Sequence, residues 1–282
     1  MRRNPLAQCY GKKPAIMSNA FLTPTESERR QVAEMLAAER LAAVNAGLLP
    51  VRMRHTFYTR YGKRALDIVF ALIAIVLTLP VNLLIGVVTF FDVGRPILFR
   101  QQRAGLNGRL FAIVKFRNMR ETRSAQGRLL PPNERVTSWG KFVRKTSLDE
   151  LLNFISVLKG DMSFIGPRPL LPEYLPRYHL RHRMRHCVRP GLECPPREHS
   201  NRAWTWQEQL DNDIWYVENI SFGVDCKMMW NLLRFAFNHQ TTAARAEAAR
   251  GYFMGYSEQG VAVEWGEIPQ EYIERALRQP PV

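Results

Sequence analysis

The chain has 282 residues, of which 46% are hydrophobic, so it can bury one substantial core and does not have the composition of a wholly disordered protein. Its formal net charge of +15 favours polyanionic surroundings, such as nucleic acid, anionic lipid headgroups or phosphorylated substrates. The cysteines lack the paired spacing of a zinc site and are too few for a disulfide framework, so we expect reduced thiols at Cys9, Cys187, Cys194 and Cys226.

Residues 1–50 are expected to form a helical extension. Residues 1–30 contain no apolar run followed by a small-residue cleavage site, so a secretory signal is not expected. Thr23 offers an N-cap, Pro24 a first helical position and Glu26 the third, ahead of an Ala-rich stretch. We therefore predict a helix of about five or six turns. Its apolar face, which includes Val32, Leu36 and Val44, is expected to pack on a partner or on the membrane.

The stretch from Ile68 to Phe91 contains no charged side chain. As one straight helix it would be roughly 36 Å long, which is enough to cross a bilayer. Pro80, near its midpoint, lacks an N–H and clashes with the preceding turn, and Asn82 adds a polar amide. Each arm would then be too short to cross alone, so residues 51–95 are predicted to contain a re-entrant membrane helix hairpin.

Basic residues flank this apolar stretch on both sides. Because Lys and Arg near membrane segments favour the cytoplasmic side, two basic flanks predict that both ends lie there. A buried core helix of a soluble protein is the alternative, although an uncharged run of this length is about twice the usual globular helix. The flanking residues are Arg52, Arg54, Arg60, Lys63 and Arg64 before the stretch, and Arg95, Arg100, Arg103 and Arg109 after it.

The following part of the chain predicts a helix-rich α/β (α+β) domain. Short apolar or alternating runs at 97–99 and 110–115, separated by glycines, are typical of strands and turns. A helix is predicted over 147–158, closed by Gly160, and an irregular loop over 161–176. Residues 227–237 predict another helix, which could lie in a membrane interface or in a core.

The sequence Ser147-Leu148-Asp149-Glu150 has two interpretations. Ser147 and Glu150 have the spacing of a capping box, which would give the acids a structural role at a helix start. However, Arg144 and Lys145 precede them and Arg168 follows in a Gly-Pro-Arg-Pro loop, which favours an anion site. A phosphate-transfer site needs cations, a nucleophile or base, and usually a divalent metal held by carboxylates.

At these residues the sequence resembles the bacterial sugar transferase family, the monotopic phosphoglycosyl transferases that start glycan assembly on a polyprenyl phosphate. The matching motifs occur in order between about residues 60 and 237, which makes the resemblance specific. They are Lys63–Asp67, Lys115–Met119, Arg144–Leu151, Gly160–Ser163, Ile165–Pro169, Arg189–Gly191 and Asp213–Asn219.

The resemblance implies transfer of a sugar-1-phosphate from a UDP-sugar to polyprenyl (undecaprenyl) phosphate, with release of UMP, as the first membrane step of glycan assembly. It implies that Asp149 attacks the β-phosphate and carries the phosphosugar as a covalent intermediate. Glu150 inherits the association of the family's Glu with Mg²⁺. The implied substrate-binding residues are Lys115, Arg117, Arg144, Arg168 and Asp213.

The resemblance also implies a location and a domain organisation. The catalytic domain, residues 96–239, is expected on the cytoplasmic face of the bacterial inner membrane, and residues 1–50 and 240–282 are extensions outside the resemblance. Many relatives continue after Pro190-Gly191 with a Gly-Trp-Ala-Gln-Val-Asn-Gly-Arg-like segment, which residues 192–199 do not match. The transferred sugar, the glycan pathway and the oligomeric state are therefore left open.

The sequence also bears on a zinc site, a nucleic-acid partner and a role without catalysis. The histidines of the basic stretch 177–189 lack Cys or carboxylate partners at zinc-ligand spacing, so the stretch is expected to hold lipid headgroups or donor phosphates. A nucleic-acid partner is not expected, because interleaved aromatic and basic residues and a helix-turn-helix pattern are both missing. A catalytically inactive membrane scaffold of the same family is the alternative function, but it would not need Asp149, Glu150 and Arg168 together.

Overall fold

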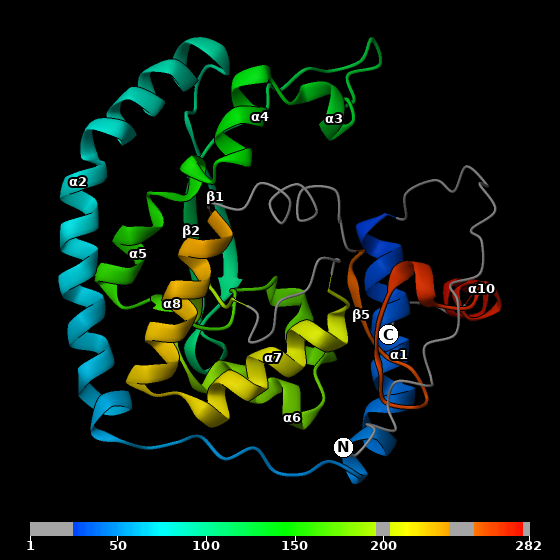
Figure 1. Ribbon diagram of the computed structural model, residues 1–282. Helices are drawn as coiled ribbons and strands as arrows, with labels where there is room; N and C mark the ends of the chain where they lie inside the picture. Colours follow the sequence, from blue (N-terminus) through cyan, green and yellow to red (C-terminus); the bar gives the residue numbers. More distant parts are fainter. Residues whose placement is uncertain (1–24, 196–203, 237–250, 279–282) are drawn as a thin grey trace.

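The computed structural model describes residues 25–195, 204–236 and 251–278 of the chain. Figure 1 shows a long helix along one edge, small sheets and short helices in the middle, and a further helix with the C-terminal segment at the opposite edge. The helices are α1 Glu26–Ala46, α2 Lys63–Asp92, α3 Pro132–Arg135, α4 Ser138–Lys145, α5 Asn153–Lys159, α6 Leu180–Arg183, α7 Trp206–Asn219, α8 Phe222–Ala236 and α10 Gln270–Arg278.

The described strands form three sheets of two strands each. β1 and β2 are antiparallel and pair Phe99 with Lys115, β3 and β4 are parallel, and β5 and β6 are antiparallel. The helix-rich mixed fold expected from the sequence is confirmed, and so are the two strands expected after the apolar stretch. The strand bounds are β1 Leu98–Ala104, β2 Leu110–Phe116, β3 Ser163–Ile165, β4 Gly191–Glu193, β5 Phe253–Tyr256 and β6 Ala262–Glu264.

The apolar stretch forms α2, which follows a π-helical turn at Tyr58–Gly62. Together they are the one helix in the described residues that is long and apolar enough to cross a membrane. The helix is continuous through Pro80 and follows a curved course in Figure 1. Two separate arms are therefore not seen, and re-entry into the membrane stays a prediction.

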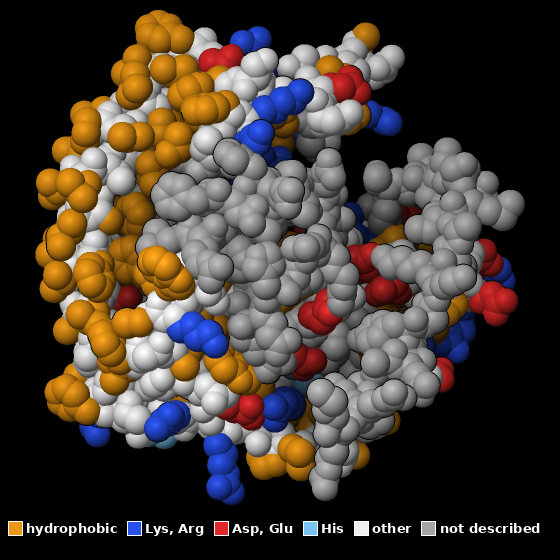
Figure 2. All heavy atoms as spheres, viewed as in Figure 1, with side chains coloured by type: hydrophobic (Ala, Val, Ile, Leu, Met, Phe, Trp, Pro, Cys, Tyr) orange, Lys and Arg blue, Asp and Glu red, His pale blue; other side chains and the backbone are white. Residues whose placement is uncertain are grey.

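Nearly all of the surface of α2 that faces away from the domain is apolar. Leu77, Val76 and Phe91 expose between 69% and 80% of their surface, and Figure 2 shows hydrophobic side chains covering this edge of the molecule. Exposed apolar surface of this extent is unfavourable in water, so it indicates a membrane or another apolar partner.

The first turns of α2 are tied to the domain by polar side chains. The guanidinium of Arg64 donates hydrogen bonds to the carbonyls of Val157 and Leu158, at 2.6 and 2.7 Å, and so caps the C-terminal end of α5. The carboxylate of Asp67 accepts a 2.9 Å hydrogen bond from the Ser163 hydroxyl at the start of β3. The motif Lys63–Asp67 therefore fixes the start of α2 to the end of α5 and to the start of β3.

The N-terminal helix and the C-terminal segment form one body. α1 begins at Glu26 with Thr25 as its N-cap, which forms a capping box with Glu28. The predicted cap, Thr23, lies outside the described residues. Val32 and Leu36 are buried against the C-terminal segment, in a core with Ala33, Met254, Ile268, Ile273 and Ala276.

The expectation that the apolar face of α1 packs on a partner or the membrane is therefore wrong. A second core joins this terminal body to the middle of the molecule, where Phe253 and Tyr256 of β5 pack with Tyr174 and Trp206. The predicted extensions 1–50 and 240–282 are thus not independent, because their described parts share a core.

Candidate active site

The turn before the two adjacent acids has an unusual backbone. Helix α4 ends at Lys145, and Ser147 adopts the left-handed conformation, with φ 56° and ψ 19°. For a residue with a Cβ this conformation costs about 1–2 kcal/mol, so the surrounding structure must hold it. The Ser147 side chain makes no capping hydrogen bond, so the capping-box interpretation of Ser147 and Glu150 is wrong.

The predicted continuous helix 147–158 is divided into a short 3₁₀ helix, Leu148–Glu150, and α5. The buried Asn153 at the start of α5 accepts a 3.2 Å hydrogen bond from the backbone N–H of Val114 on β2. This contact sets the acids against strand β2. Gly160 ends α5 in the left-handed conformation, with φ 94°, as the sequence predicts.

Asp149 is buried, with 4% of its surface exposed. Burial raises the pKa of its carboxyl group, and the negative charge of Glu150 raises it further, whereas Lys115 and Arg144 act in the opposite direction. Arg144 lies on α4 and is exposed. A desolvated carboxylate with a raised pKa is more basic than an ordinary Asp, and buried groups of this kind occur often at functional sites.

Glu150 lies between two cations. One guanidinium nitrogen of Arg168 is 3.2 Å from each carboxylate oxygen of Glu150, and the Lys115 ammonium is 3.8 Å from one of them. The other terminal nitrogen of Arg168 is 3.2 Å from Glu193. Asp149, Glu150, Lys115 and Arg168 therefore form one group, called here the acidic-basic cluster.

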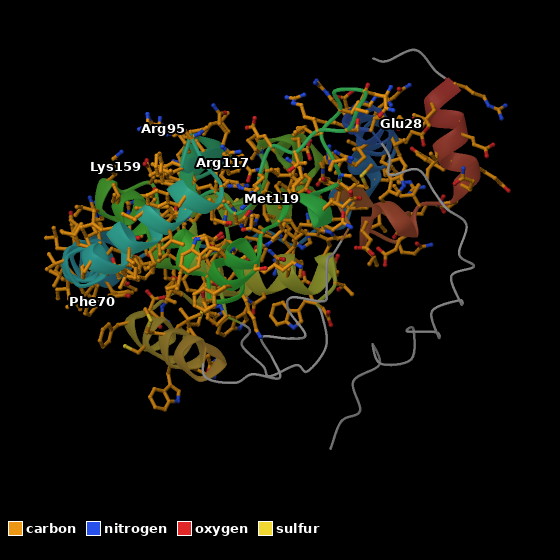
Figure 3. The ribbon with its side chains drawn as sticks, turned by 90° about the horizontal axis from the view of Figure 1, so that it is seen from above. Glu28, Phe70, Arg95, Arg117, Met119 and Lys159 are labelled. Carbon is orange, nitrogen blue, oxygen red and sulfur yellow. The ribbon has the colours of Figure 1, made fainter. Side chains whose placement is uncertain are left out.

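Arg117 lies outside this cluster. Its guanidinium donates to the Pro96 carbonyl at 3.0 Å and to Glu121 at 3.2 Å. Arg117 therefore lies beside Pro96, the residue that follows Arg95 (both arginines are labelled in Figure 3). The structure thus places Arg117 beside the end of the membrane helix, while Lys115, two residues earlier on β2, faces Glu150.

Asp213 is linked to the acidic-basic cluster through Arg185. Its carboxylate is 2.7 Å from Arg185, and each of these two side chains is 1% exposed. The same guanidinium nitrogen of Arg185 donates a 2.7 Å hydrogen bond to the backbone carbonyl of Arg168. Asp213 therefore holds Arg185, and Arg185 holds the loop that carries Arg168.

Sequence reasoning missed three residues of this site: Arg103, Arg185 and Glu193. Burial and the positive charge of Arg168 lower the pKa of Arg103, and its Nε has no hydrogen-bond partner in the described structure. The negative charge of Glu150 acts on this pKa in the opposite direction. Alternation along β1 places Arg103 on the same face as Phe99, but only the strand register shows that this is the Lys115 face.

Two arginines of the basic stretch 177–189 do not have the expected role of holding lipid headgroups. Arg177 and Arg185 are buried, so they cannot hold lipid headgroups, and Arg177 instead donates to the Phe253 carbonyl at 2.6 Å. His182 lies 2.9 Å from the Tyr256 hydroxyl and 3.1 Å from Asp211. These residues attach the terminal body to the domain.

Comparisons with known proteins identify the family of the chain. The family described as bacterial sugar transferase matches residues 58–239, which is more than half of the chain and includes the whole acidic-basic cluster. The chain is 40% identical over 167 residues to the uncharacterized sugar transferase EpsL of Bacillus subtilis, a match that covers 59% of this chain and 83% of that protein.

Two further relatives have names that include a substrate. The chain is 29% identical to the undecaprenyl-phosphate galactose phosphotransferase of Salmonella typhimurium over 208 residues. This match covers 68% of this chain and 42% of that protein. It is 34% identical to a UDP-N-acetylgalactosamine-undecaprenyl-phosphate N-acetylgalactosaminephosphotransferase of Aeromonas hydrophila over 180 residues. This match covers 61% of this chain and 43% of that protein. The match thus spans less than half the length of these two relatives.

Proposed function

Because this chain belongs to the bacterial sugar transferase family, we propose that it transfers a sugar-1-phosphate from a UDP-sugar to a polyprenyl phosphate and releases UMP. Membership makes the chain an enzyme of the phosphoglycosyl transferase class. The names of the Salmonella and Aeromonas relatives support undecaprenyl phosphate as the acceptor. A further relative, the exopolysaccharide production protein ExoY of Sinorhizobium fredii, supports a place in exopolysaccharide or related glycan assembly.

The observation that carries this proposal is the buried carboxylate of Asp149 next to the cations that surround Glu150. A reaction at a diphosphate develops charge on phosphate oxygens, and fixed cations stabilise that charge. Arg168 offers a planar guanidinium that can bind phosphate oxygens in pairs, and Lys115 offers a point charge. The scaffold alternative gives no reason to desolvate Asp149 beside these groups.

The proposed chemistry has two steps at one phosphorus atom. A carboxylate oxygen of Asp149 bonds to the phosphorus that carries the sugar, the bond from this phosphorus to the bridging oxygen breaks, and UMP leaves with that oxygen and its electron pair. An oxygen of the polyprenyl phosphate then bonds to the same phosphorus. The bond to Asp149 breaks, and its carboxylate is regenerated.

Glu150 is the residue that we propose to hold Mg²⁺. The described residues contain no group of three or more His, Cys, Asp or Glu side chains that could hold a metal. One or two carboxylates together with substrate phosphates are the usual Mg²⁺ ligands, so Glu150 beside Asp149 suits a metal that arrives with the donor. When bound, the ion would neutralise charge on the diphosphate. Arg168, whose guanidinium now contacts Glu150, would then turn toward a phosphate oxygen.

Purified membranes that contain the protein should release UMP when supplied with the correct UDP-sugar and polyprenyl phosphate. A panel of UDP-sugars identifies the donor, excess chelator should abolish release, and Mg²⁺ should restore it. Full activity in chelator would remove Mg²⁺ from the proposal. A chain that binds the lipid but releases no UMP from any donor would be the inactive scaffold.

The proposed location is the cytoplasmic face of the inner membrane, with α2 re-entering the bilayer. In a cysteine-free background, Lys63→Cys and Arg95→Cys mark the two ends of α2. Neither position should react with an impermeant thiol reagent added from the periplasm. Labelling at one position alone would show that α2 crosses the membrane.

A further inference from the structure

The terminal body, made of α1 and the C-terminal segment, is attached to the part of the chain that leads to Arg185. Its strand β5 lies outside the residues that match the family and runs beside α1 in Figure 1. Arg177 donates to the Phe253 carbonyl of β5 at 2.6 Å. The backbone N–H of Leu180 donates to the side chain of Asn45 on α1 at 2.8 Å. Both α1 and β5 therefore hold the start of α6.

The hydroxyl of Tyr256 joins β5 to α6. It lies 2.9 Å from Nδ1 of His182 and accepts a 3.4 Å hydrogen bond from the backbone N–H of His179, the N-cap of α6. The ring of Tyr256 also stacks on that of His179, with ring centres 4.3 Å apart. All three side chains are buried. The contact therefore fixes the first turn of α6 relative to β5 without competition from water.

The second nitrogen of His182 gives this contact a direction. Burial lowers the pKa of His182, so the ring is neutral at pH 7 and only one of its nitrogens carries a hydrogen. Nε2 lies 3.1 Å from a carboxylate oxygen of Asp211 on α7, which can only accept, so the hydrogen is on Nε2. Nδ1 is then an acceptor, and the Tyr256 hydroxyl donates to it. Tyr256 and Asp211 thus hold His182 from two elements.

The same helical segment continues from His182 to Arg185. A 3₁₀ helix, Met184–Cys187, follows α6 directly, so the two residues are one turn apart, with about 5–6 Å between their Cβ atoms. Arg185 then donates to the backbone carbonyl of Arg168 at 2.7 Å. One short segment therefore carries both the contact to Tyr256 and the contact to the loop of Arg168.

We propose that Tyr256 is a positioning residue for sugar-phosphate transfer, which fixes His182 and, through α6 and Arg185, the backbone that presents Arg168 to the donor. The inference rests on the proposed function, because Arg168 binds the donor phosphates there. It gives the C-terminal segment, which lies outside the family match, a part in the reaction as well as in stability.

Tyr256→Phe tests this role, because it removes the hydroxyl and keeps the ring that packs on Phe253 and His179. The kcat/KM for the UDP-sugar should fall about three- to tenfold, the rate equivalent of one hydrogen bond. Tyr272→Phe is the matched control. It removes another hydroxyl of the terminal body, which lies 2.9 Å from Glu39 of α1, and it should leave kcat/KM unchanged.

A double-mutant cycle separates positioning of Arg168 from a general loss of folded protein. If Tyr256 acts through Arg168, Tyr256→Phe should change kcat/KM less than about twofold in an Arg168→Ala background. A loss of folded enzyme would instead lower kcat/KM by the same factor in both backgrounds. That additive result would overturn the inference, and so would a wild-type kcat/KM in the single variant Tyr256→Phe.

Amide hydrogen exchange supplies a measurement that does not need turnover. Exchange in residues 166–171 should be faster in Tyr256→Phe than in the wild type, and unchanged in Tyr272→Phe. Asn45→Ala removes the acceptor of the Leu180 N–H at a half-buried position and should also speed exchange in this loop. Unchanged exchange there in both Tyr256→Phe and Asn45→Ala would contradict the inference. A wild type that shows these differences but releases no UMP from any UDP-sugar would instead contradict the proposed function.

Discussion

Two arginine–carboxylate pairs involve the loop that carries Arg168: one contains the Arg168 side chain, and the other contacts the Arg168 backbone. In the pair of Arg168 with Glu150, the side chains are 44% and 28% exposed, whereas in the pair of Arg185 with Asp213 each is 1% exposed. A hydrogen bond from Arg185 to the Arg168 carbonyl links the two pairs. The same chemical groups therefore form one pair that can open to a substrate and another that cannot.

The difference in burial gives the two arginine–carboxylate pairs different roles. Exchange of Glu150 for a phosphate at Arg168 costs little, because water and neighbouring cations screen the exposed charges. To separate Arg185 from Asp213 would leave an uncompensated charge in the interior, which is strongly unfavourable. The exposed pair is thus suited to chemistry and the buried pair to holding Arg168 in place.

The largest expected effect is that of Asp149→Asn on turnover. The amide retains the size of the carboxylate but is a poor nucleophile, so UMP release should fall by about 10³-fold or more. The variant should remain folded by circular dichroism. A phosphosugar adduct trapped on the wild type should be missing from it, and near-normal UMP release would show that another group is the nucleophile.

Arg168→Ala should lower kcat/KM by about 10²- to 10³-fold, the usual loss when one fixed group that stabilises transition-state charge is removed. Arg181→Ala is the matched control, because Arg181 pairs with Glu218 on α7, away from the cluster. Its activity should stay within about twofold of wild type. Equal losses in the two variants would mean that both arginines act only through the overall positive charge.

The main expected effect of Asp213→Asn is a loss of stability. It leaves Arg185 buried without its counter-charge, at a cost of about 3–5 kcal/mol in the free energy of unfolding. The double variant Asp213→Leu/Arg185→Met should recover much of this loss in a denaturant titration. Its kcat should nevertheless remain low, because the Arg168 carbonyl has lost its donor; full recovery of kcat would show that Arg185 does not position Arg168.

The pKa of Asp149 predicts a dependence of stability on pH. Burial raises this pKa above its ordinary value of 3.8, so between those two values the native state binds more protons than the unfolded state. The Asp149 contribution to stability therefore falls as pH rises through that window and stays low above it. Asp149→Asn should melt above the wild type at neutral pH, and the difference should shrink in acid; a lower melting temperature at neutral pH would contradict the burial argument.

The smallest expected effect concerns Glu193, which shares Arg168 with Glu150. Glu193→Gln removes one of two carboxylates that compete with donor phosphates for this guanidinium, so the KM for the UDP-sugar should fall about two- to fivefold. The kcat should hardly change. An increased KM would indicate that Glu193 contacts the donor instead of restraining Arg168.

Local patterns in the sequence were enough to predict several parts of the molecule. The uncharged run from Ile68 to Phe91 predicted an apolar helical segment, although the break expected at Pro80 is not seen, and the short runs separated by glycines predicted strands where β1 and β2 lie. The adjacent acids at Asp149 and Glu150, between basic residues, identified the cluster. These features depend on the chemistry and spacing of neighbouring residues, which the sequence contains directly.

The tertiary structure alone decided which of these residues meet. Spacing allowed a capping box at Ser147, yet packing holds that residue in a left-handed turn that presents Asp149 to the cluster. Lys115 and Arg117 are two residues apart in the sequence, but only Lys115 lies on β2 and faces Glu150. The partner of α1 is the distant C-terminal segment. Such contacts depend on how whole elements pack and in which register strands pair, and the periodicity of a single segment does not contain that information.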